Sequence, residues 1–127
     1  MSARKRASEP ARPTSAAPSE RAQLARLALD AALGLEGVVS SHAGPLGTRV
    51  TADREERLPG VLATALAGGR YGVELHLVTE LVPLPQLADL VRSRVERAAS
   101  LAGLADVLGP VDITIEDVVM PNEVTKR

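Results

Sequence analysis

The sequence predicts an α+β fold, a small two-layer sandwich in which two helices pack on one face of a mixed sheet of three to four strands. Segments 20–33 and 85–101 repeat apolar residues at helical spacing, whereas segments 71–81 and 111–119 alternate apolar and polar residues as half-buried strands do. Their order along the chain is helix, short strands, strand, helix and strand, which is typical of a small α+β domain.

The chain has a suitable length for one domain. It has 127 residues, of which 45% are hydrophobic and 24% charged, an ordinary composition for a globular protein. There is one tyrosine and no phenylalanine or tryptophan, so the core must consist of leucine, valine, isoleucine and alanine. We expect residues 1–20 to form a disordered, basic tail rich in proline, alanine and serine, 21–119 to form the domain, and 120–127 to form a short polar tail.

The first predicted helix covers residues 20–33, which are rich in the strong helix formers alanine and leucine. Ser19 is placed to cap its N-terminus, and Gly34 and Gly37 are placed to end it. The face that we expect to be buried consists of Leu24, Leu27, Ala28, Ala31 and Leu35.

Segment 38–69 gives weaker signals. We expect Val38 and Val39 to be buried where the chain turns, residues 48–52 to form a short edge strand, and the charged run 53–57 to be a solvated loop or helical turn. Segment 61–67 suits a helix or a strand by composition. Because the Gly68–Gly69 pair after it is a hairpin signal, we predict a strand paired with the next segment.

The second half of the chain is clearer. Val73, Leu75 and Leu77 form the inner side of a strand that ends at prolines, and Val111, Ile113 and Ile115 form the inner side of the last strand. Between them a helix begins at Pro85 and is capped by Gly103. Its expected apolar stripe consists of Leu87, Leu90, Val91, Val95, Ala98 and Leu101.

If the two long strands share a sheet, their other sides form one half-polar surface facing away from the helices. This polar face consists of Glu74, His76, Val78, Glu80, Asp112, Thr114 and Glu116. We expect His76 to face solvent, and we expect the polar face to lie in water or to contact another subunit.

The residues offer no catalytic constellation. Cysteine is absent, which excludes disulfides, thiolate metal sites and cysteine nucleophiles. His42 follows Ser40 and Ser41, but no aspartate or oxyanion loop can be tied to them. We therefore expect no catalytic residue, no metal and no cofactor; a small metal-dependent enzyme using Glu74 and His76 is an alternative.

A literal G-x-x-G spans residues 69–72, and it contains Arg70 and Tyr71 as candidate turn contacts. Such loops clamp RNA in KH modules, where they join two helices. The net charge of −1 and the near absence of aromatic residues weigh against a nucleic-acid partner. For these reasons a KH-like RNA-binding module is only the alternative function, not the leading one. Because the chain shows no long apolar run and no secretory signal, we expect a cytoplasmic location.

Four phrases in order resemble the alkaline shock protein (Gls-type) family of bacterial envelope stress response proteins. They are LALDAALGLEGVVS, YGVELHLVTEL, VPLPQLADLVRSRVERAASLAGL and VDITIEDVV. The positions that match the family pattern are Gly37, Val38, Val73, Leu75, Leu77, Val78, Pro85, Leu87, Ala88, Val91, Arg92, Val95, Val111, Ile113, Ile115, Asp117 and Val118. The resemblance covers roughly residues 21–119. A short strand that often precedes the first helix in the family has no counterpart in PTSAAPSE, residues 13–20.

The resemblance implies a non-enzymatic cytoplasmic protein that lies beneath the membrane. Family members self-associate, are held in place by a separate membrane-anchored partner, and support envelope homeostasis under stress. No catalytic, metal-binding or cofactor-binding residues come with the resemblance. The missing strand bears on how subunits pair, so filament formation does not carry over directly.

Overall fold

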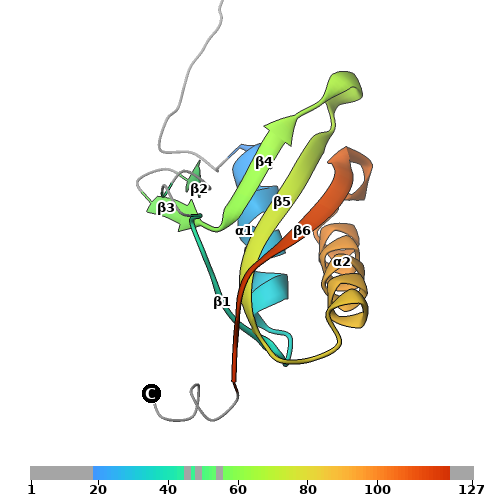
Figure 1. The fold of residues 1–127 in the computed structure, drawn as a ribbon. Coiled ribbons are helices and arrows are strands. Elements are labelled where there is room, and N and C mark those ends of the chain that lie inside the picture. Colours follow the sequence, from blue (N-terminus) through green and yellow to red (C-terminus); the bar gives the residue numbers. More distant parts are fainter. Residues whose placement is uncertain (1–18, 45–46, 48–49, 54–55, 121–127) are drawn as a thin grey trace, which may run out of the picture.

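Strand β5 (Tyr71–Glu80) is the centre of the main sheet, which has four strands. The structure is a computed structural model that describes residues 19–44, 47, 50–53 and 56–120. Strand β4 (Val61–Ala65) pairs antiparallel with the first half of β5, and β1 (Val38–Ser41) pairs antiparallel with its end. On the opposite edge, β6 (Leu108–Val119) runs parallel to β5 (Figure 1). The prediction of a mixed sheet of three to four strands is confirmed.

Helices α1 (Glu20–Leu33) and α2 (Leu84–Leu101) lie on the same side of this sheet (Figure 1). The Oγ of Ser19 accepts a hydrogen bond from the backbone N of Ala22 at 3.2 Å, which caps α1 as expected. After α2, Gly103 has a φ of 76°, and the N of Leu104 donates to the carbonyl of Ala99 at 2.8 Å. This closing turn satisfies carbonyls that the end of a helix leaves free. Within the described residues, neither helix is long and apolar enough to cross a membrane.

The core lies between the sheet and the helices and consists of small aliphatic side chains. Three residues of the expected α2 stripe are buried, and they are spaced four residues apart: Leu87, Val91 and Val95. The expectation was wrong for two members, because Leu90 is 54% exposed and Leu101 is 80% exposed. The buried stripe of α2 is narrower than its apolar stripe, which leaves leucines on the flanks of the helix.

A second, two-stranded sheet consists of β2 (Val50–Asp53) and β3 (Glu56–Pro59), paired antiparallel. The edge strand expected at 48–52 therefore belongs to this hairpin and not to the main sheet, and residues 48–49 lie outside the described residues. The charged run 53–57 was expected to be a loop or helical turn, but its first residue ends β2 and its last two begin β3. Val38 and Val39 form strand β1 rather than a turn. These differences all concern short strands. Such strands are defined by their pairing partners, which local sequence does not encode.

The hairpin covers the free edge of β4. The hydroxyl of Thr51 donates to the carbonyl of Val61 at 2.8 Å and accepts from the N of Ala63 at 3.2 Å. An arginine from α1, Arg21, donates to the carbonyl of Ala63 at 3.4 Å. Since an uncovered strand edge is a template for pairing with another chain, these contacts cover the part of the edge that β4 forms.

Candidate functional site

The register of β5 and β6 brings the two halves of the polar face together. Glu74 lies opposite Asp112, and His76 lies opposite Thr114. Beyond Leu77 the register shifts by one residue, so that Val78 lies opposite Asp117. The shift is a β-bulge with Glu116 as the additional residue, and bulges of this kind redirect a side chain.

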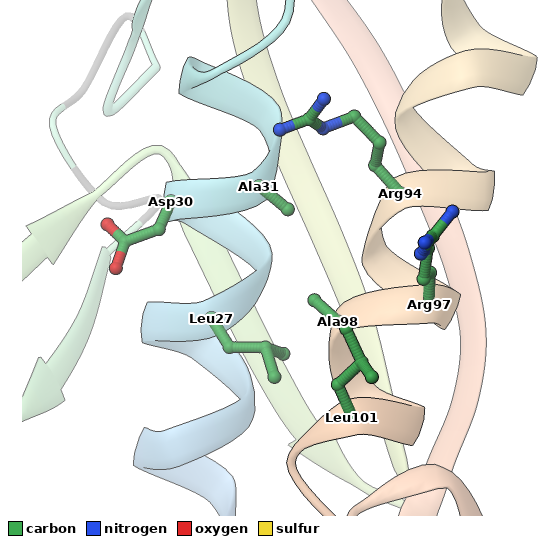
Figure 2. A pocket seen from close by; sticks show the side chains of 7 residues that line it. All are labelled: Leu27, Asp30, Ala31, Arg94, Arg97, Ala98 and Leu101. Atoms are coloured by element: carbon green, nitrogen blue, oxygen red, sulfur yellow. The ribbon is translucent and has the colours of Figure 1, made fainter.

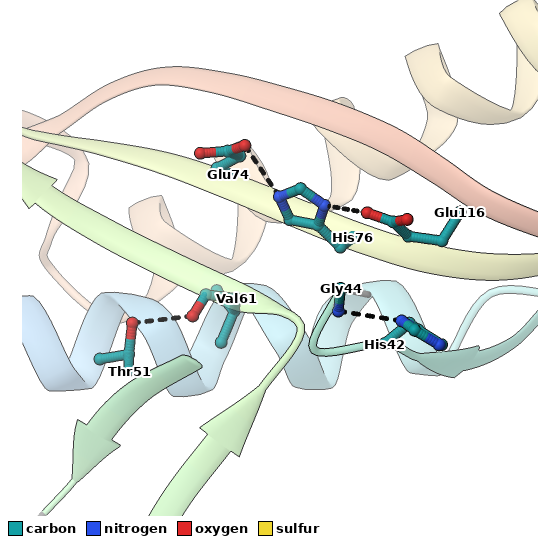
Figure 3. A network of polar contacts seen from close by, with 7 residues as sticks. All are labelled: His42, Gly44, Thr51, Val61, Glu74, His76 and Glu116. Atoms are coloured by element: carbon teal, nitrogen blue, oxygen red, sulfur yellow. Dashed lines mark hydrogen bonds and ion pairs between the residues drawn. The ribbon is translucent and has the colours of Figure 1, made fainter. Parts of the chain in front are cut away.

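His76 is buried at the centre of the polar face, so the expectation that it faces solvent is wrong. Its exposed fraction is 3%. The Nε2 of His76 lies 2.8 Å from Oε2 of Glu74, and its Nδ1 lies 2.5 Å from Oε2 of Glu116 (Figure 3). The side chain of Glu116 is 19% exposed, whereas that of Glu74 is 40% exposed. A histidine between two carboxylates satisfies its hydrogen-bonding groups without water, which permits its burial.

The backbone of His76 is also the point where β1 and β4 meet. Its N donates to the carbonyl of Gly60 at 2.8 Å, and its carbonyl accepts from the N of His42 at 2.9 Å. Gly60 has a φ of 85°, and a Cβ at this position would lie 2.5 Å from the Cβ of Ser41 and 2.9 Å from the carbonyl O of His76. Only glycine fits this junction without a shift of the backbone. His76 therefore pairs with β6 and hydrogen-bonds to the residue just before β4 and to the residue just after β1.

Glu74, His76 and Glu116 form a hydrogen-bonded cross-link between two strands. A neutral imidazole has one N–H, so donation to both carboxylates requires the doubly protonated ring. The two carboxylates lie on different ring nitrogens, so they do not converge with the imidazole on one point where a cation could bind (Figure 3). Among the described residues, no group of three or more histidine, aspartate or glutamate side chains could hold a metal ion. The cluster joins β5 to β6 at the bulge.

The G-x-x-G segment begins at the last residue of a 3-10 turn, η2 (Ala67–Gly69), and ends at the second residue of β5. The Nη2 of Arg70 donates to the carbonyl of Leu108 at 2.8 Å. The ring of Tyr71 is partly buried and packs against the core. KH loops join two helices and clamp the RNA backbone, usually with basic residues nearby. In this chain the local cation already binds the first residue of β6, so no contact in the described residues favours RNA clamping.

Two features of the surface were not foreseen from the sequence. The outer edge of β6 has no strand partner within the described residues, and a groove lies between α1 and α2. The sequence also contains a signal for the bulge in β6. The alternation of VDITI breaks at the consecutive acidic residues Glu116 and Asp117. The groove gave no such signal, because its four apolar residues were all assigned to the core.

Comparison with protein-family models gives no match, and comparison with curated proteins also gives none. Among solved structures, the chain is similar to a MamM CTD variant with a TM-score of 0.44 and 14% sequence identity. The match covers 78% of this chain and 99% of the other. A similarity of this degree does not indicate a function.

Proposed function

We propose that the chain is a non-enzymatic structural and interaction protein of the envelope stress response, whose subunits join through the outer edge of β6. In this proposal a separate membrane-anchored protein holds the assembly at the cytoplasmic side of the membrane, as the resemblance to the alkaline shock protein family implies. The observation that carries the proposal is the length of the unpaired edge. Strand β6 has 12 residues, and its one strand partner in the described structure is β5.

The direction of the backbone groups identifies which residues would pair. On β5 the N–H groups of His76 and Glu80 point to β4 and β1, so the odd-numbered residues of β5 point to β6. With Leu75 opposite Ile113, this parity directs the N–H and C=O groups of Ile113 and Ile115 to the outer edge. Val111 shares this edge, and its carbonyl accepts from Nε of Arg92 at 3.0 Å.

The two edges of the sheet differ in how far side chains cover their backbone groups. The edge of β4 is covered by the hydroxyl of Thr51 and by Arg21, whereas one side chain, Arg92, covers part of the edge of β6. Long uncovered edges pair with other chains unless they are blocked. Two copies related by a twofold axis would pair β6 with β6 in antiparallel orientation and join their sheets into one.

Sedimentation velocity of the purified chain over a hundredfold range of concentration tests self-association. We expect the weight-average sedimentation coefficient to rise with concentration. Affinity capture from detergent-solubilised native membranes tests recruitment, and we expect a membrane-spanning protein to co-purify in fixed proportion. A chain that stays monomeric throughout and captures no membrane protein would remove the proposal.

A further inference from the structure

A groove of about 550 Å³ runs between α1 and α2 on the side facing away from the sheet. Helix α1 contributes Leu27, Asp30 and Ala31, and α2 contributes Arg94, Arg97, Ala98 and Leu101 (Figure 2). Each set follows the i, i+3, i+4 spacing of one helical face, and α2 adds i+7. The α2 side of the groove therefore extends over about 10 Å, roughly two helical turns.

The floor of the groove is apolar. Leu27 and Leu101 lie at one end, and the alanines Ala31 and Ala98 leave room for a backbone to approach closely (Figure 2). Leu101 is 80% exposed, the largest exposed fraction among the large apolar side chains described. An apolar floor of this kind between two helices is a docking surface for a third helix.

The rim of the groove is cationic. Arg94 and Arg97 are exposed and have no hydrogen bond or ion pair among the described residues. The Nη2 of Arg94 lies 3.1 Å from the position that a Cβ on Gly34 would occupy, so this guanidinium stands at the C-terminal end of α1, where a cation is favourable. No described contact places the guanidinium of Arg97 at the end of a helix. The carboxylate of Asp30 is directed away from α2 (Figure 2), so it neutralises neither arginine.

We propose that this groove binds an acidic amphipathic helix of a partner protein, with leucine-type side chains on the floor and carboxylates against Arg94 and Arg97. Charge complementarity selects this occupant. The segment before the described residues carries Arg4, Lys5, Arg6 and Arg12 against Glu9, and the last seven residues carry Lys126 and Arg127 against Glu123. Either terminal segment, or the same groove of a second copy, would bring cations against cations. The groove lies on the helices, so its occupancy does not depend on pairing at β6.

The test uses three probes with the full chain. The first is a 12-residue amphipathic peptide with leucines at i, i+3, i+4 and i+7 and glutamates elsewhere, and the second has lysines in place of the glutamates. The third is a vesicle of phosphatidylglycerol. Fluorescence anisotropy measures peptide affinity, co-sedimentation measures vesicle binding, and amide shift mapping locates the peptide.

We expect the glutamate peptide to shift the amides of Leu27, Ala31 and Ala98 and to bind at least about tenfold more tightly than the lysine peptide. Arg97→Glu should weaken the glutamate peptide by about tenfold, and Leu101→Ser should also weaken it. Arg57→Glu, on an exposed arginine of β3, is the matched control and should leave affinity unchanged.

Equal affinity for the two peptides, or an Arg97→Glu variant that binds as the native chain does, would overturn the proposal. Vesicle binding that depends on Arg97, without binding of the glutamate peptide, would also overturn it, because the groove would then be a lipid-binding surface. Circular dichroism of each variant separates loss of binding from loss of folding.

Discussion

Nδ1 of His76 and Oε2 of Glu116 lie 2.5 Å apart across β5 and β6, and Glu116 is the additional residue of the bulge. The contact joins the central strand to the strand whose outer edge we propose as the subunit interface. The buried histidine therefore ties that strand to the centre of the sheet at the bulge. Glu74 and His76, the pair considered in the sequence as a metal site, hydrogen-bond to each other.

The two carboxylates on His76 should contribute unequally to stability. Glu116 is the more buried of the two and makes the shorter hydrogen bond. We expect Glu116→Gln to lower the free energy of unfolding by about 1 to 3 kcal/mol. The same change at Glu74 should cost less than about 1 kcal/mol, because solvent screens it. Urea denaturation of both variants measures the difference. Equal losses in the free energy of unfolding would contradict the larger contribution that we expect of Glu116.

Gly60 should tolerate alanine much less well than Gly68 does. Both have a positive φ, 85° for Gly60 and 81° for Gly68. A Cβ on Gly60 would collide with Ser41 and the backbone of β5, whereas a Cβ on Gly68 would meet nothing within 4 Å. Each substitution costs roughly 1 to 2 kcal/mol in backbone strain, and the collision at Gly60 should add about 1 to 3 kcal/mol. Thermal unfolding should rank the variants in this order, and equal melting temperatures would contradict the described junction.

Threonine to valine should have opposite effects at two buried positions. The hydroxyl of Thr51 bonds to Val61 and Ala63, so its removal leaves two backbone groups unpaired and should cost about 1 to 3 kcal/mol. The hydroxyl of Thr79 is buried without a partner among the described residues, so Thr79→Val should be neutral or stabilising. Chemical denaturation gives both values, and a destabilised Thr79→Val variant would show that its hydroxyl has a bonding partner after all.

The sequence predicted the long elements well because each contains its own signal. Ser19 and Gly34 mark the ends of α1, and the alternation of Val73, Leu75 and Leu77 marks the buried side of β5. The hairpin between β4 and β5 was also predicted, because its glycines have a conformation that other residues rarely adopt. In these segments the fold is encoded locally.

The candidate site was predicted less well because its features depend on contacts between distant segments. The alternation along β5 placed His76 on the correct side of the sheet, but its burial depends on Glu116, 40 positions away. Strand β1 and hairpin β2–β3 are short, and their pairing partners define them. Leu101 looked like a core residue because it continues the apolar stripe of α2, yet the structure leaves it exposed.

Assembly through the outer edge of β6 is tested most directly by sedimentation of variants at Ile113, whose N–H points to that edge. Ile113→Pro removes that N–H without removing a hydrogen bond to β5, and Ile113→Val is the control that keeps the N–H with a similar side chain. We expect that, at equal concentration and with circular dichroism showing folded protein, the proline variant is monomeric and the valine variant associates as the native chain does. A folded proline variant that associates as strongly as the native chain would contradict assembly through this edge.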